Sequence, residues 1–151
     1  MHTNVWGPTQ VQSLGSSRYY VTLIDDVTRK TWVYCIRQKF DVFDTFKKWK
    51  SLAENETGKS LKCLRSDNGG EYFNKEFDSC CSHNGIRREK TIPRTPQENG
   101  VTERMNRTIM ECARCMRLHV GFPLQFWADA IKTIVYLINR WPSSALDGGI
   151  P

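Results

Sequence analysis

The sequence predicts an α/β domain in which helices flank a mixed β-sheet. The first third of the chain alternates short runs of β-branched and aromatic residues with turns. The middle alternates helical and strand patterns, and the last third is helical. This order requires crossovers, so the later strands should run parallel to the first. At 151 residues the chain is long enough for one domain with an ordinary core.

Three strands joined by short turns are expected at the start of the chain. Residues 3–12 begin as a strand and then reach the turn-rich stretch Leu14-Gly15-Ser16-Ser17. Residues 19–24 and 31–36 are rich in β-branched and aromatic side chains, and Asp25-Asp26 ends the earlier run. These strands should form an antiparallel meander. A turn centred near Gly15-Ser16 would place Asn4 opposite roughly Val27.

The middle of the chain predicts two helices and two short strands. Apolar residues recur at helical spacing from Val42, with Asp41 as a plausible N-cap and Gly58 as the stop. Residues 61–65 form a short strand that leads to Asp67. A helix over about residues 74–84, closed by Gly85, and a strand over residues 86–92 follow. Residues 93–100 contain two prolines and a glycine and are expected to form a loop.

Two helices are predicted in the last third. One spans about residues 102–119 and stops at Gly121, and the other begins at Pro123 and ends before Pro142. Much of the surface of the last helix is apolar, so it is either well buried or part of an interface. Residues 1–142 are assigned to one domain and residues 143–151 to a linker or tail.

The composition suits a polyanionic partner such as nucleic acid, although many other proteins are equally basic. The net charge is +6 and the pI about 9.1. No membrane span is expected, because no run of about 18 apolar residues occurs. The start of the chain does not resemble a signal peptide, so an intracellular protein with six reduced cysteines is expected. Cys112 and Cys115 alone are a weak zinc signal, and unliganded thiols are the alternative.

Two carboxylates carry the strongest functional signal in the chain. Asp67 follows an apolar run beside a glycine pair, and Glu103 opens a helix after Gly100, with 35 residues between the two acids. Carboxylates at the ends of such elements can converge on hard cations, and hard cations on oxygen ligands serve phosphoryl chemistry.

A helical projection places Glu103 on a polar face. An apolar stripe faces away from it, and three arginines share its face; the stripe is Met105, Ile109, Cys112 and Met116, and the arginines are Arg107, Arg114 and Arg117. A position early in the helix would also favour a carboxylate through the helix dipole. A solvated glutamate paired with Arg107 is the alternative. The arginine row, which can contact phosphates, favours a functional role.

Several motifs resemble the integrase catalytic core of copia-type LTR retrotransposons, in order and in spacing over essentially the whole chain. They are Asp67-Asn68-Gly69-Gly70-Glu71, Gln97-x-Asn99-Gly100-x-x-Glu103-Arg104-x-Asn106-Arg107, Ile24-Asp25-Asp26 with Arg29 and Trp32, Phe126-Trp127-Ala128, and Leu137-x-Asn139-Arg140. The resemblance implies an RNase H-like fold, a five-stranded mixed sheet with an antiparallel meander and parallel strands, flanked by helices.

The resemblance also implies a function, namely metal-dependent polynucleotidyl transfer that processes the 3′ ends of retrotransposon DNA and inserts them into target DNA. The family uses an Asp, Asp, Glu triad with two Mg²⁺ or Mn²⁺ ions, and Asp67 and Glu103 match its last two acids. Double-stranded DNA is the implied partner, in the nucleus, with a homodimer or higher multimer. The implied DNA-binding residues are Asn99 and Gly100 in a loop beside the site, and Lys90, Arg94, Arg107 and Arg114.

The chain departs from the family at the first acid of the triad. The family motif His-Thr-Asp-x-x-Gly-Pro reads His2-Thr3-Asn4-Val5-Trp6-Gly7-Pro8 here. Asparagine keeps an acceptor oxygen but loses the negative charge, so weaker metal binding and impaired activity are expected. Asp25 or Asp26 could substitute for the missing acid, although a turn after a strand also explains both residues. An inactive DNA-binding or assembly module and a nuclease with another substrate remain alternatives.

Overall fold

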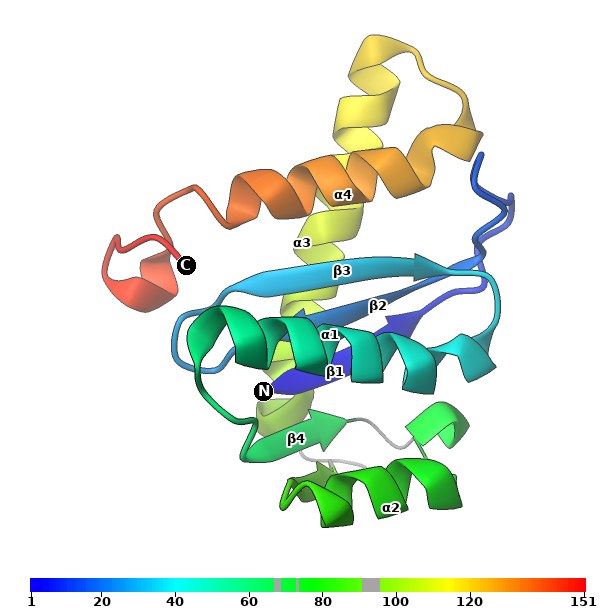
Figure 1. Cartoon of the computed structure of the whole chain (residues 1–151). Helices are drawn as coiled ribbons and strands as arrows, with labels where there is room; N and C mark the ends of the chain where they lie inside the picture. The colour runs from blue at the N-terminus through cyan, green and yellow to red at the C-terminus, as the bar shows by residue number, and fades with distance from the viewer. Residues whose placement is uncertain (67–68, 73, 91–95) are drawn as a thin grey trace.

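The computed structural model describes residues 1–66, 69–72, 74–90 and 96–151, with residues 96–99 described by their backbone alone. Its centre is a five-stranded sheet in the order β3-β2-β1-β4-β5 (Figure 1). The strands are β1 (His2–Trp6), β2 (Tyr19–Ile24), β3 (Thr31–Ile36), β4 (Cys63–Ser66) and β5 (Arg87–Lys90). The first three are antiparallel, β4 pairs parallel with β1, and β5 pairs parallel with β4. The predicted α/β fold with a mixed sheet is confirmed.

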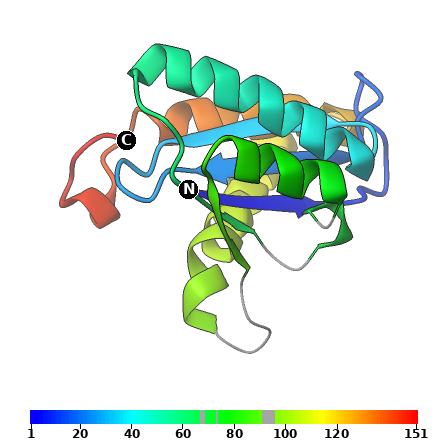
Figure 2. The ribbon, with the colours of Figure 1, turned by 60° about the horizontal axis from the view of Figure 1, so that its bottom comes forward.

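In the part of the chain that the structure describes, four α-helices cover the two faces of this sheet (Figures 1 and 2). They are α1 (Val42–Thr57), α2 (Lys75–His83), α3 (Pro96–Val120) and α4 (Trp127–Ile138). The first two helices lie on one face and the last two on the other. None of the described helices is both long and apolar enough to cross a bilayer.

Strand alternation divides the buried residues into two cores. Val21, Leu23 and Leu64 point toward α1 and α2, where they pack with aromatic residues such as Phe46 and Phe77. On the opposite face, Tyr20 joins a second cluster formed mainly by α3 and α4. β2 is thus covered on both sides, which explains its nearly continuous apolar sequence.

The register of the first hairpin differs from the predicted one. Asn4 pairs with Thr22 rather than Val27. The predicted turn forms, with Ser13 bonded to Ser17, but the chain before it bulges. The amide of Thr9 bonds to the carbonyl of Arg18, so the segment from residue 9 to residue 13 lies opposite the direct link from Ser17 to Arg18. These extra residues shift the register.

The long helix begins earlier than predicted. α3 starts at Pro96, so residues 96–100, expected in a loop, are helical. Proline is compatible with the first helical turn, and one glycine inside a helix costs only about 1 kcal/mol. Glu103 therefore lies about two turns inside α3, too far from its start for the helix dipole to favour the carboxylate.

The ends of the other helices largely agree with the sequence. Gly58 ends α1 in the left-handed conformation, with φ of 64°, as predicted. Asp41 precedes α1 but makes no side-chain cap, because its carboxylate accepts a bond from the amide of Gln38 instead. Asn74 caps α2 by accepting a bond from the amide of Phe77. Beyond α4, Ser144–Leu146 forms a 3-10 turn, and the division at residues 142 and 143 stays a prediction.

The aromatic core beneath α1 and α2 should dominate stability. Phe77 is fully buried, and its ring lies 4.9 Å from that of Phe46 and 5.3 Å from that of Phe43. We expect Phe77→Ala to lower the free energy of unfolding by about 3–5 kcal/mol, because the substitution removes a buried ring and leaves a cavity that the neighbouring side chains fill only in part. Phe40→Ala is the control, since Phe40 is 73% exposed. Urea denaturation measures both, and equal losses would contradict this packing.

Candidate active site

Asn4 and Glu103 are brought into one region by Asn106. The Asn106 side-chain amide donates from Nδ2 to Oδ1 of Asn4 at 3.2 Å. Its Oδ1 accepts a hydrogen bond from the Thr22 hydroxyl at 3.1 Å. Asn106 and Thr22 are buried, so the bridge fixes α3 against β1 and β2. Glu103 is exposed and lies one turn before Asn106 on α3, and therefore next to the Asn4 end of this bridge.

Asp67, the predicted second acid, lies outside the described residues. The described residues before and after it, Ser66 and Tyr72, both contact Thr3. Ser66 ends β4 and pairs with Thr3. On the other side, the Tyr72 hydroxyl shares a 2.9 Å hydrogen bond with the Thr3 hydroxyl. Arg88 donates to the carbonyl of Tyr72 at 2.7 Å. The described ends of this segment thus meet β1 at the residue that precedes Asn4.

The carboxylates of Asp25 and Asp26 contact residues outside the candidate site. Ile24 pairs with His2, so both acids lie beyond the start of β1 and away from Asn4. The Asp25 carboxylate accepts from the amide and the hydroxyl of Thr28, at 2.9 and 2.8 Å, and stabilises the turn. The Asp26 carboxylate lies 2.5 Å from Nε2 of His2 and 3.1 Å from the Arg65 guanidinium. The turn interpretation therefore explains Asp25, and the contacts with His2 and Arg65 account for Asp26.

The residues predicted to contact DNA are distributed along two elements. Lys90 ends β5, pairs with Ser66, and is exposed, so it lies at the same edge as the end of β4. Arg107 and Arg114 are exposed on α3, and Gly100 is part of the same helix. Arg94 lies outside the described residues, as does the side chain of Asn99.

The buried face of α3 differs from the predicted stripe. It consists of Thr102, Asn106, Ile109 and Ala113, while Cys112 is exposed. The projection counted only apolar residues and therefore missed two polar residues that face the sheet. Asn106 belongs to the motif Glu103-Arg104-x-Asn106-Arg107, and its spacing of three from Glu103 was the available signal for a role beside the site.

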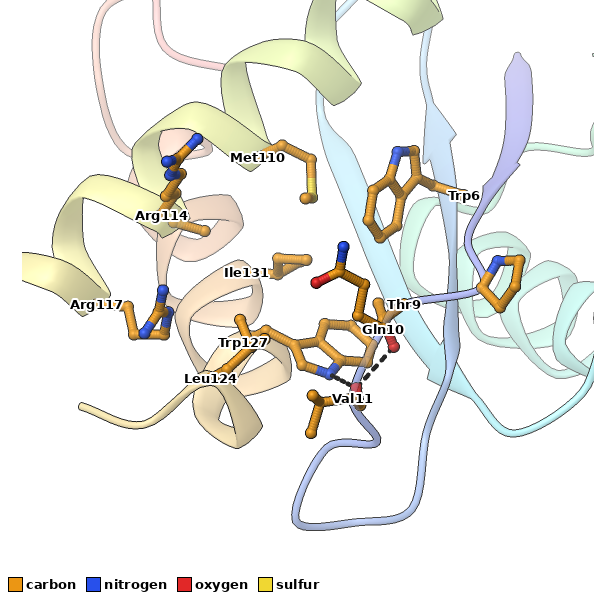
Figure 3. A pocket seen from close by; sticks show the side chains of 12 residues that line it. Trp6, Thr9, Gln10, Val11, Met110, Arg114, Arg117, Leu124, Trp127 and Ile131 are labelled. Atoms are coloured by element: carbon orange, nitrogen blue, oxygen red, sulfur yellow. Dashed lines mark hydrogen bonds between the residues drawn. The ribbon is translucent and has the colours of Figure 1, made fainter.

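A cavity of about 600 Å³ lies between α3, the start of α4 and the loop after β1 (Figure 3). The first part of its wall is Trp6, two residues after Asn4 on the same face of β1, and Met110, one turn after Asn106. No pattern in the sequence predicts this cavity. Its remaining lining residues are Pro8, Thr9, Gln10, Val11, Ala113, Arg114, Arg117, Leu124, Trp127 and Ile131.

The six cysteines are free thiols. Among the described residues, no three of the histidine, cysteine and acidic side chains gather into a metal-binding group. Cys112 and Cys115 are exposed on α3. The oxygen donor beside the end of β4 is the Asn4 amide, and Glu103 lies one helical turn before Asn106, the residue that bonds to Asn4.

Comparison with known families agrees with this geometry. A family described as the integrase core domain matches residues 3–96. The chain belongs to this family. It is 52% identical over its whole length to a retrovirus-related Pol polyprotein from the transposon TNT 1-94 of Nicotiana tabacum. It is 38% identical over 97% of its length to the Pol polyprotein of transposon RE2 of Arabidopsis thaliana. The copia-type resemblance is therefore confirmed.

The chain spans about a tenth of these polyproteins, 11% and 10% of their lengths. Among solved structures, it resembles a chain in a simian T-cell lymphotropic virus intasome in complex with PP2A regulatory subunit B56 gamma. The TM-score is 0.67 at 17% identity, over 91% of this integrase core domain and 48% of that chain. This likeness shows the RNase H-like fold.

The buried His2 beside the site should make stability depend on pH. Burial lowers the pKa of His2 below its usual value, although the adjacent Asp26 acts in the opposite direction. Below about pH 6.5 the unfolded chain therefore binds a proton that the folded protein resists. We expect the free energy of unfolding to fall between pH 7 and pH 5, and His2→Gln to reduce that fall. Urea titrations at both pH values measure this effect.

The exposed His83 provides the control, because His83→Gln removes an imidazole that α2 leaves in solvent. Its pH dependence should match that of the unmodified chain. An unchanged pH dependence in His2→Gln would contradict the role given to His2.

Proposed function

We propose that this chain is the catalytic core of an integrase that joins retrotransposon DNA to target DNA by metal-dependent polynucleotidyl transfer. One observation carries the proposal. The pairing of Thr3 with Ser66 places Asn4 beside the end of β4, the strand that leads to Asp67. The Asn106 bridge holds the part of α3 that carries Glu103 against Asn4. Family membership supports the reaction type.

The donor set fits Mg²⁺ or Mn²⁺, which favour oxygen ligands. Asp67 and Glu103 would hold the metal ions through carboxylates, and Asn4 would contribute its amide oxygen. When bound, two such ions activate the attacking oxygen and stabilise the leaving oxygen of a phosphodiester. The protein residues would position the DNA strand and neutralise its charge, a task that Lys90 and Arg107 share by their location.

Asn4 should leave this copy impaired. A carboxylate at this position would add one negative charge beside two cations, and the amide does not. The Asn106 amide donates to Oδ1 of Asn4, and it could donate equally to a carboxylate oxygen. The surroundings of position 4 therefore suit the family's aspartate, and a reversion should fit without rearrangement.

The reversion Asn4→Asp tests both the reaction and the impairment. With flanking domains restored and a processed DNA end supplied, we expect Asn4→Asp to raise strand transfer at least about a hundredfold in Mg²⁺, the scale of one electrostatic catalytic group. Joined products on a denaturing gel measure the effect. Asn4→Asp combined with Glu103→Gln is the control and should be inactive.

Each other outcome has a definite meaning. Equal activity of the unmodified chain and Asn4→Asp would contradict the impairment. Inactivity of both would contradict catalysis by this copy, and cleavage without joining would indicate a nuclease with another substrate.

The second candidate function is a DNA-binding or assembly module that has kept the fold. The uncharged Asn4 and the exposed Arg107 and Arg114 on α3 favour it. Without metal, we expect salt-sensitive DNA binding in which Arg107→Gln or Arg114→Gln lowers the slope of log K against log salt by about 1. Fluorescence anisotropy measures this slope. Arg37→Gln, exposed just past β3 at the far edge of the sheet, should leave it unchanged, and equal effects would contradict a DNA surface on α3.

A homodimer or higher multimer acting in the nucleus is part of the proposal. Of the two explanations for the apolar last helix, burial accounts for most of it, because six of its side chains are buried in this chain. Asn139 ties its end to β3 through two hydrogen bonds to the backbone of Thr31, at 2.8 and 2.7 Å. The surface left for another copy near α4 includes Tyr136, Leu137 and Trp141, all exposed.

A further inference from the structure

We propose that the cavity between α3, α4 and the loop after β1 receives one unpaired nucleotide at the end of the DNA substrate. This inference rests on the proposed function, because it assigns a second contact to the same DNA. The cavity adjoins the candidate site directly. Trp6 shares a strand face with Asn4, and Met110 follows Asn106 by one helical turn.

The walls of the cavity provide a stacking surface. One face of the Trp6 ring stacks on Tyr20, at a centroid distance of 5.4 Å and an interplanar angle of 26°. Its side chain also lines the cavity, opposite Met110 and Ile131 (Figure 3). Aromatic side chains held in this way are typical stacking partners for unpaired bases.

A polar group and two cations complete the fit. The Gln10 amide extends into the space between Trp6 and Ile131 (Figure 3), and no described residue hydrogen-bonds to it. An amide offers one donor group and one acceptor, the pair that recognises the edge of adenine. Arg114 and Arg117 line the same cavity, and none of the described lining residues is acidic. This charge distribution matches the phosphates on either side of a base.

The shape of the cavity is fixed by hydrogen bonds across its floor. Trp127 donates from Nε1 to the carbonyl of Val11 at 3.0 Å, and the Thr9 hydroxyl donates to the same carbonyl at 2.8 Å. Arg117 donates to the carbonyl of Phe122 at 2.8 Å. These contacts hold the loop after β1, the start of α4 and the end of α3 together, so the cavity exists before a ligand arrives.

An acidic, apolar peptide is the other occupant that such walls would accept. The planar ring, the amide and the contact with a phosphodiester site favour the nucleotide. Because unpairing a base costs free energy, ends that already carry unpaired bases should bind best.

The test compares a duplex end with a two-base overhang against a blunt end of the same sequence. The terminal unpaired base is 2-aminopurine, whose fluorescence falls when it stacks. We expect quenching on binding and about tenfold tighter binding of the overhang. Trp6→Leu should remove both effects, and Trp6→Phe should keep most of them. Phe40→Leu is the control, because Phe40 is an aromatic residue that is 73% exposed and lies outside the cavity.

Gln10→Ala repeats the test without touching the Trp6–Tyr20 stack, so a misfolded Trp6 variant does not decide the result. We expect it to reduce discrimination for a terminal adenine over thymine by about fivefold. Equal binding of both ends, or quenching that persists in Trp6→Leu, would overturn the nucleotide assignment and leave the cavity to a protein segment. Failure of both DNAs to bind at low salt would instead overturn the proposed function.

Discussion

Asn106 connects the longest helix of the domain to its two central strands. It donates to Asn4 on β1 and accepts from Thr22 on β2, so its rotamer fixes both the depth and the rotation of α3. The exposed residues of this helix, Glu103 and Arg107 among them, take their positions from this bridge and from the packing of Ile109 and Ala113 in the second core. Because Asn106 and Thr22 are both buried, removing either partner would leave a polar group without its hydrogen bond.

The sheet provides the second half of the arrangement. β1 is the middle strand and the only described one that pairs antiparallel on one side and parallel on the other. Its parallel partner β4 ends beside Thr3, while its other neighbour brings Thr22 under α3. The candidate site therefore depends on the switch from antiparallel to parallel pairing at β1. This switch brings residues from distant parts of the sequence together beside the end of β4.

Much of the fold could be predicted because each pattern had a local cause. β2 and β3 are rich in β-branched and aromatic residues, and Gly58 and Gly85 follow the ends of α1 and α2 with positive φ. The register of the first hairpin could not, because the bulge before Ser13 depends on contacts of Thr9 and Arg18 across the loop. The prediction of the buried face of α3 was wrong for a related reason. Asn106 is polar, and a polar side chain is buried only where it finds specific hydrogen-bond partners, here Asn4 and Thr22. Asp67 and Glu103 are predicted from motif spacing, which needs no coordinates, and their role stays a prediction, whereas the cavity arises only when three separate segments pack together.

The edge strand β5 has a consequence for how copies of the domain can associate. It is four residues long, and all four, Arg87, Arg88, Glu89 and Lys90, are charged. An edge of this kind resists strand-to-strand extension, because a second copy would have to bring matching charges into register along a very short ladder. On this side of the molecule the sheet therefore ends, and self-association into continuous sheets or fibres is disfavoured there. Contacts between copies at this side would have to use side chains rather than backbone pairing.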